Sequence, residues 1–163
     1  VMDYVKGACS ERIYPVGRLD RNTTGVLLMT NDGELAHRLL SPKNHVDKCY
    51  FARIQGIITN EDVETFAKGI SLSFQTMPAK LELLSVNENQ DISEVKITIQ
   101  EGKYHQVKRM FHAVGKEVLY LKRLSMGNLA LDENLAAGEY RELTEEEVRS
   151  ILTGVTGAGC RVQ

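Results

Sequence analysis

The sequence has only three cysteines and contains no long apolar run. Cys9, Cys49 and Cys160 are odd in number and far apart, so a framework of disulfide bonds is not expected. No apolar stretch approaches the roughly 20 residues that a membrane-spanning helix needs, and the N-terminus lacks the apolar core of a secretion signal. We therefore expect a soluble protein of the reducing cytoplasm that has no membrane partner.

The usual signatures of metal and nucleotide sites are also missing. The four histidines show no zinc-ligand spacing, and no cluster of aspartates suits magnesium. The chain has neither the Gly-x-Gly-x-x-Gly fingerprint nor a phosphate-binding Gly-Lys-Ser/Thr loop, and it has no serine or cysteine nucleophile elbow. The prediction is a protein without a metal or a cofactor.

Charge is distributed unevenly along the chain. Its 163 residues suffice for one domain with its own core, and the formal net charge is −2. Residues 103–123 nevertheless hold six basic residues and one acid, whereas residues 59–92 hold six acids and two lysines. The basic segment can bind the phosphates of a nucleic acid, and a solvated charged helix is the alternative.

Hydrophobic periodicity predicts both strands and helices. The apolar run 26–30 is typical of a strand buried on both faces, and further strands are predicted at 48–56, 79–86, 94–100, 118–124 and 139–143. Capping residues and helical spacing predict helices after Asp32, after Thr59, over 104–114 and after Thr144. This mixture predicts an α+β fold with a mixed, largely antiparallel sheet and flanking helices, followed by a disordered tail at 153–163.

The segment Gly17-Arg-Leu-Asp-Arg21 holds an arginine and an aspartate two residues apart. Residues i and i+2 of an extended backbone point to the same side, so we expect Arg18 and Asp20 to pair. A nearby guanidinium keeps a carboxylate ionised, and an ionised carboxylate can act as a nucleophile. A structural ion pair that holds a turn is the alternative.

Two further segments combine aromatic and basic residues. Tyr50, in Lys48-Cys-Tyr-Phe51, is suited to stacking on a nucleobase or, alternatively, to packing at a strand edge. The segment from Glu101 to Met110 opens the predicted third helix with a basic stripe beside its apolar stripe. A solvated amphipathic helix is the alternative for that segment.

Four blocks of sequence follow one another within residues 1–152. They are Tyr14-Pro-Val-Gly-Arg-Leu-Asp20, Thr24-Gly-Val-Leu-Leu-Met-Thr-Asn-Asp-Gly-Glu-Leu-Ala-His37, Lys48-Cys-Tyr50 and Glu101-Gly-Lys-Tyr-His-Gln-Val-Lys-Arg-Met-Phe111. Together they resemble the ribosomal-RNA pseudouridine synthases, most closely the branch that modifies one uridine of small-subunit (16S) rRNA. The resemblance implies an isomerase without a cofactor. A 23S enzyme of the same family, a non-catalytic rRNA-binding or ribosome-assembly module, and a hydrolase are the alternatives.

The resemblance also implies roles for individual residues. Asp20 matches the catalytic aspartate, which attacks either C6 of the uracil or C1′ of the ribose, and Tyr50 matches the tyrosine that stacks on the base. Arg18 matches the arginine that fills the gap left by the everted uridine, and Lys108 matches a basic partner of the aspartate. Leu121 is expected to line the pocket, with a plain core leucine as the alternative. The residues expected to contact RNA are Arg18, Arg21, Lys103, His105, Gln106, Arg109 and Arg123.

The start of the chain departs from the family pattern. Members of the family usually carry a small N-terminal RNA-binding domain, followed by a strand with a Lys-Pro-x-Gly segment, and neither precedes Tyr14. We interpret residues 1–152 as the catalytic domain of a truncated or proteolysed protein. This interpretation predicts weak and poorly selective RNA binding.

Overall fold

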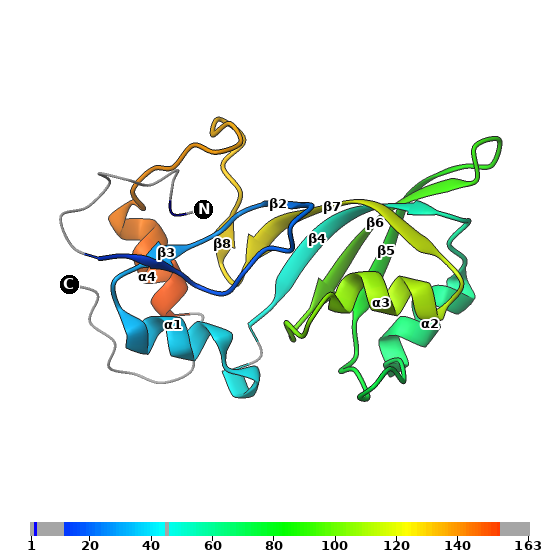
Figure 1. Ribbon diagram of the computed structural model, residues 1–163, viewed down its shortest axis with the longest axis horizontal. Coiled ribbons are helices and arrows are strands. Elements are labelled where there is room, and N and C mark those ends of the chain that lie inside the picture. The colour runs from blue at the N-terminus through cyan, green and yellow to red at the C-terminus, as the bar shows by residue number, and fades with distance from the viewer. Residues whose placement is uncertain (1, 3–11, 45, 154–163) are drawn as a thin grey trace.

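The structure is a computed structural model that describes residues 2, 12–44 and 46–153 (Figure 1). Its strands are β1 (Tyr14–Pro15), β2 (Thr23–Gly25), β3 (Met29–Thr30), β4 (Lys48–Gln55), β5 (Lys80–Asn87), β6 (Ile92–Ile99), β7 (Glu117–Met126) and β8 (Leu129–Ala130). Its helices are α1 (Gly33–Leu40), the 3-10 helix η2 (Pro42–Asn44), α2 (Asn60–Lys68), α3 (Gln106–Ala113) and α4 (Glu145–Thr153). The predicted α+β class is confirmed. The predicted disordered tail lies outside the described residues, apart from its first residue.

The main sheet has the strand order β2-β7-β4-β6-β5, and β8 pairs with β7. Only β2 and β7 run parallel, and the other neighbours are antiparallel. Helices α2 and α3 lie against one face of this sheet (Figure 1). The sheet is therefore mixed and mainly antiparallel, as predicted.

The main core lies between the sheet and these two helices. Val95, Ile97 and Ile99 alternate along β6 and are at most 3% exposed, so the period of two correctly predicted the inward face of this strand. From the helices, Phe66 of α2 and Phe111 of α3 meet with ring centroids 4.9 Å apart. Ala67 of α2 is exposed, so the buried stripe of this helix is narrower than its apolar residues indicate.

A second core lies under the small sheet formed by β1 and β3. It comprises residues from the β1 and β3 region, α1, the segment before β4, the end of β7, β8 and α4: Val16, Leu28, Leu35, Ala36, Leu39, Val46, Met126, Leu129 and Ile151. Strand β7 connects the two cores, because Leu121 belongs to the main core and Met126 to the second. The segment between β1 and β2 crosses from the small sheet to the main sheet, and this segment carries Arg18 and Asp20.

Two of the predicted strands are wrong. The apolar run 26–30 contains only the short strand β3, because the chain leaves the main sheet after Gly25 and joins the small sheet at Met29. Leu28 is buried in the second core and Val26 packs against that core, which accounts for the apolar composition of the run. Val26 N donates to the Arg123 carbonyl (3.0 Å), and Val16 N donates to the Leu28 carbonyl (2.8 Å). Residues 139–143 form no strand.

The region 139–143 is held by charge instead of by strand pairing. The guanidinium of Arg141 binds Asp132 at 2.8 Å and Glu147 at 2.7 Å. The two-residue strand β8 was not predicted, since a segment this short carries no periodic signal.

Local capping chemistry correctly predicted where α1, α2 and α4 begin, whereas α3 begins two residues later than predicted and has no side-chain cap. The Asp32 carboxylate accepts hydrogen bonds from Glu34 N and Leu35 N at the start of α1. Thr59 opens α2 in a reciprocal capping box, and Thr144 and Glu147 exchange the equivalent bonds before α4. In the part of the chain that the structure describes, no helix is both long enough and apolar enough to cross a membrane.

The pairing of β2 with β7 requires a glycine at position 25. Gly25 has a φ of 122°, and a Cβ there would clash with the backbone of Arg123, whereas a Cβ on Gly115 (φ 77°) would meet no atom within 4 Å. We predict that Gly25→Ala lowers the free energy of unfolding by about 3 kcal/mol, because backbone strain and overpacking add. Gly115→Ala, the matched control, should cost only the strain of about 1 kcal/mol.

Urea unfolding followed by circular dichroism measures both variants. If both variants lose the same free energy of unfolding, the close approach of β2 to β7 does not require a glycine at position 25.

Candidate functional site

The loop before β2 carries the first candidate residue, Asp20. The register Thr23 to Leu121 and Gly25 to Arg123 fixes β2 along β7, and Asp20 lies three residues before β2. The Asp20 carbonyl accepts a hydrogen bond from Thr23 N at 2.8 Å, which closes a turn. The Asp20 side chain remains 31% exposed, so a ligand can reach its carboxylate from solvent.

The residue that approaches Asp20 comes from the start of α3. Nε2 of His105 lies 3.8 Å from Oδ1 of Asp20. His105 is the residue before α3 and has a left-handed backbone with a φ of 46°, a conformation that non-glycine residues rarely adopt. Its ring stacks on that of Tyr104, with centroids 3.9 Å apart and an interplanar angle of 15°. The loop before β2 and the turn before α3 therefore meet at one point.

Tyr50 lies on the core side of this point. It is 9% exposed, and it faces Arg123 in the pairing of β4 with β7. Burial raises the pKa of the Tyr50 hydroxyl, the positive charge of Arg123 lowers it, and the negative charge of Asp20 raises it. Tyr50 is therefore within electrostatic reach of both the carboxylate and the guanidinium.

Arg123 is buried rather than exposed at the surface, and its predicted contact with RNA stays a prediction. The residue is 2% exposed, and its Nε donates to the Val26 carbonyl at 2.9 Å. Its Nη2 atom is buried, and none of the described residues offers it a hydrogen-bond partner. Since Leu121 and Arg123 are two apart on β7, both point into the core. Arg123 places a positive charge beneath Tyr50.

Gln106 is also buried, and its predicted contact with RNA stays a prediction. It is 3% exposed, and its Nε2 donates to Oε2 of Glu101 at 2.6 Å. The other carboxylate oxygen of Glu101 accepts from Met77 N, and the Glu101 carbonyl accepts from Nζ of Lys48 at 3.4 Å. This buried network ties α3 to β4 and fixes the start of the helix.

Lys48 contributes a second buried cation. It is 6% exposed, and burial, followed by the charge of Arg123, lowers the pKa of its amine, whereas Glu101 raises it. Sequence analysis assigned no role to Lys48. Lys48 lies on the inward face of β4, a strand that was predicted correctly, and this position could have indicated that the residue is buried.

Two of the predicted RNA-contacting cations lie beside Phe74. Nζ of Lys103 lies 3.9 Å from the Phe74 ring centroid, and the guanidinium of Arg109 lies 5.7 Å from it. Nη2 of Arg109 also donates to Oγ of Ser73 at 2.6 Å. Both cations are therefore positioned at the surface close to the start of α3.

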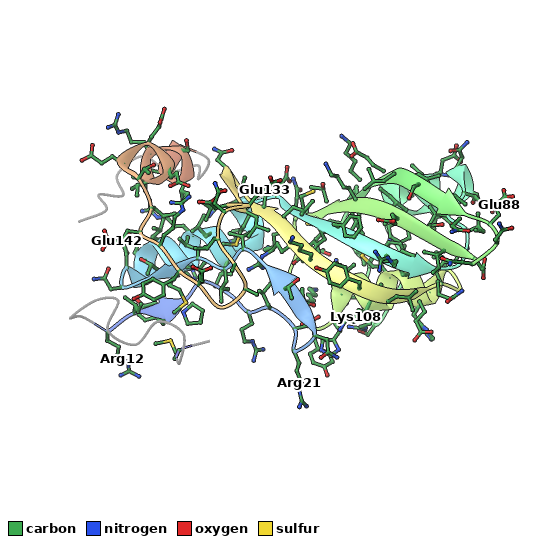
Figure 2. All side chains as sticks on the ribbon, turned by 90° about the horizontal axis from the view of Figure 1, so that it is seen from above. Arg12, Arg21, Glu88, Lys108, Glu133 and Glu142 are labelled. Atoms are coloured by element: carbon green, nitrogen blue, oxygen red, sulfur yellow. The ribbon has the colours of Figure 1, made fainter. Side chains whose placement is uncertain are left out.

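The remaining predicted residues lie near this site but do not pair with Asp20. Arg18 and Arg21 are exposed and Lys108 is half-buried, and neither Arg18 nor Lys108 makes an ion pair with Asp20 in the described part of the chain. Figure 2 shows Arg21 projecting away from the body at the edge where Lys108 also lies. The predicted pair of Arg18 and Asp20 is wrong because residues 18–20 are not in a strand.

Leu121 is 3% exposed and belongs to the same core as Tyr50. This burial fits a core leucine and a pocket wall equally, so its role stays a prediction. Among the residues that the structure describes, no three His, Cys, Asp or Glu side chains gather as metal ligands would.

Sequence analysis missed Tyr104. Its side chain is 74% exposed although it is aromatic, and it stacks on the histidine that approaches Asp20. An aromatic residue inside the basic segment 103–123 was the available indication of a role for Tyr104. A single residue forms no periodic pattern, so the hydrophobic spacing did not point to it.

Several known proteins similar to this chain are named for the same activity. The family described as RNA pseudouridylate synthase matches residues 2–113. The uncharacterized RNA pseudouridine synthase YtzG of Bacillus subtilis (strain 168) is 53% identical over 137 residues, which cover 83% of this chain and 56% of the relative. Ribosomal small subunit pseudouridine synthase A of Escherichia coli (strain K12) is 44% identical over 144 residues, or 86% of this chain and 60% of the relative.

Two further comparisons agree. Ribosomal large subunit pseudouridine synthase B of Bacillus subtilis (strain 168) is 45% identical over 152 residues, or 93% of this chain and 62% of the relative. A crystal structure of a pseudouridylate synthase superposes with a TM-score of 0.79 at 43% identity, covering 85% of this chain and 59% of that chain. The chain thus spans less than two thirds of the length of the proteins it matches.

The buried amine of Lys48 generates a prediction about pH. Its pKa is lowered from 10.5 in the folded protein, so below pH 10.5 the unfolded chain binds more protons at this residue and stability rises with pH. We predict that the unfolding free energy of the wild type, relative to Lys48→Met, increases as the pH is raised toward 10.5, because the folded protein gives up the proton of this amine before the unfolded chain does. Urea unfolding at a series of pH values measures the difference. Parallel curves would contradict the lowered pKa.

Proposed function

This chain belongs to the RNA pseudouridylate synthase family, and on that premise we propose that it isomerises a uridine of ribosomal RNA to pseudouridine. The observation that carries the proposal is the position of Asp20. Its carboxylate is one third exposed, lies 3.8 Å from His105, and is close enough to Tyr50 to raise the pKa of that hydroxyl. A nucleophile, an aromatic ring and a buried guanidinium thus meet at one place.

In the proposed reaction the carboxylate of Asp20 attacks either C6 of the uracil or C1′ of the ribose. The bond between N1 and C1′ breaks, the uracil turns, and C5 forms the new bond to C1′. The bond between the carboxylate and C6 or C1′ breaks in the same sequence, and the electron pair returns to Asp20 as a free carboxylate. C5 loses its proton while N1 gains one, so the product has the mass of the substrate and no cofactor is consumed. The residues have to hold the detached base during the turn, because otherwise it escapes into water.

In this proposal Tyr50 and Arg123 hold the detached uracil. The Tyr50 ring stacks on the uracil, a contact that proteins commonly use for unpaired bases. The buried guanidinium of Arg123 lies beneath Tyr50 and retains an unpartnered Nη2, which suits it to a negative charge on the carboxylate or on the detached uracil. Lys108 makes no ion pair with Asp20 among the described residues. We therefore propose that it binds the RNA backbone instead of acting as the basic partner of Asp20.

The uridine has to leave the RNA stack before Asp20 can reach it. Eversion costs a few kcal/mol, and a side chain that fills the gap offsets part of this cost. Arg18 is exposed on the same loop as Asp20, two residues away, which supports this role for its guanidinium. Arg21, Lys103 and Arg109 bind the flanking phosphates in this proposal.

We take residues 1–152 as the catalytic domain, acting on ribosomal RNA in the cytoplasm without a metal ion. A 16S substrate is the first choice and a 23S substrate the alternative. The relatives named for the small and the large ribosomal subunit are 44% and 45% identical to this chain, so identity does not favour either RNA. Both transcripts therefore belong in every assay.

We predict that Asp20→Asn abolishes pseudouridine formation while leaving RNA binding within about twofold, because the amide keeps the shape but is a poor nucleophile. Wild type and variant are incubated with 16S and 23S rRNA transcripts, and pseudouridine is mapped by carbodiimide adducts and primer-extension stops. A binding module would give no stops with either form. A hydrolase would release uracil or broken RNA.

We predict that Arg18→Ala reduces kcat/KM by about tenfold or more, since the gap left by the everted uridine is no longer filled. Arg12→Ala removes another exposed arginine, at the far end of the molecule, and serves as the control (Figure 2). If kcat/KM falls equally in the two variants, Arg18 contributes only a positive charge that attracts RNA and does not fill the gap.

A further inference from the structure

We propose that Tyr104 is a stacking platform for an unpaired nucleotide next to the everted uridine. The inference rests on the proposed function and adds a substrate contact to it. It commits the surface at the start of α3 to single-stranded RNA rather than to a protein partner.

The exposure of Tyr104 is the first observation. It is 74% exposed, whereas the next most exposed large apolar side chain among the described residues, Leu119, is 49% exposed. The ring of His105 stacks on one face of Tyr104 at 3.9 Å, which leaves the rest of the tyrosine open to solvent. An aromatic ring in this state is suited to accept a nucleobase.

The backbone of Tyr104 is held in place. Nη1 of Arg109 donates to the Tyr104 carbonyl at 3.3 Å, and Arg109 is itself fixed by Ser73 at 2.6 Å. Lys103 N donates to Oε1 of the buried Gln106 at 3.3 Å. A platform fixed on both sides loses little conformational freedom when a base stacks on it.

The distance to the proposed nucleophile fits a neighbouring nucleotide. His105 contacts the Asp20 carboxylate at 3.8 Å through Nε2 and the Tyr104 ring at 3.9 Å through its face. One imidazole therefore separates the carboxylate from the platform. A base stacked on Tyr104 would lie beside the everted uridine rather than in its position.

The charges around Tyr104 favour RNA as the occupant. Lys103 and Arg109 flank it, and Phe74 orients both cations. Positive side chains beside an exposed aromatic ring are the arrangement by which proteins bind single strands, through phosphates and stacked bases together.

The test compares Tyr104→Ala with Tyr104→Phe. Tyr140→Ala is the matched control, because Tyr140 is 47% exposed but lies in the loop before α4. The probe is a single-stranded RNA of nine nucleotides with a central uridine and 2-aminopurine on its 5′ or 3′ side. Fluorescence quenching and affinity are measured in the Asp20→Asn background, so that the uridine is not converted.

We expect the parent protein to quench 2-aminopurine on one side of the uridine. Tyr104→Ala should lose the quenching and bind about tenfold more weakly, whereas Tyr104→Phe and Tyr140→Ala should behave as the parent. The inference is overturned if the parent protein does not quench the probe, or if Tyr104→Ala quenches and binds as the parent does. Tyr104 is at the surface, so thermal unfolding of Tyr104→Ala should match that of the control.

Activity separates this inference from the proposed function. If the Asp20-containing protein forms no pseudouridine but the probe is still quenched through Tyr104, the proposed function fails and the platform stands. If that protein is active and Tyr104→Ala retains its kcat/KM on rRNA transcripts, the platform fails alone.

Discussion

The parallel pairing of β2 with β7 is the constraint on which the site depends. Gly25 allows the two backbones to approach, and Arg123 secures the pairing twice: its carbonyl accepts from Val26 N, and its guanidinium donates to the Val26 carbonyl. This pairing holds the loop that carries Asp20 against the start of α3, where His105 meets it. It also places Arg123 directly opposite Tyr50 on β4. One pairing thus brings together three segments that lie far apart in the sequence.

The interior beneath the site is more polar than a core needs to be. Lys48, Arg123, Glu101 and Gln106 are all at most 7% exposed, and two of the four are cations. Burying cations costs free energy unless each finds a partner, and Nη2 of Arg123 has none among the described residues. Positive charge that is already desolvated acts strongly on a negative charge that enters or forms nearby. We interpret this polar interior as a feature that lowers the stability of the fold and, in return, makes the site favourable for anions.

Sequence reasoning predicted the elements whose signals are local. The alternation of β6, the caps of α1, α2 and α4, and the apolar stripe of α3 needed only neighbouring residues. The run 26–30 was misread because an apolar run that packs on the second core outside the main sheet has the composition of a buried strand. The contact between Asp20 and His105 joins residues 85 positions apart, and no local pattern encodes it. The burial of Arg123 could have been predicted, since Leu121 shares its face of β7.

The central claim is that an everted uridine meets Asp20 on the face of the sheet covered by α3. A crystal structure of Asp20→Asn bound to an rRNA fragment tests this claim most directly. The account predicts one uridine out of the stack, with its uracil against Tyr50 and its ribose facing position 20. RNA bound to the opposite face of the main sheet, or a uridine still stacked in its helix, would contradict the account.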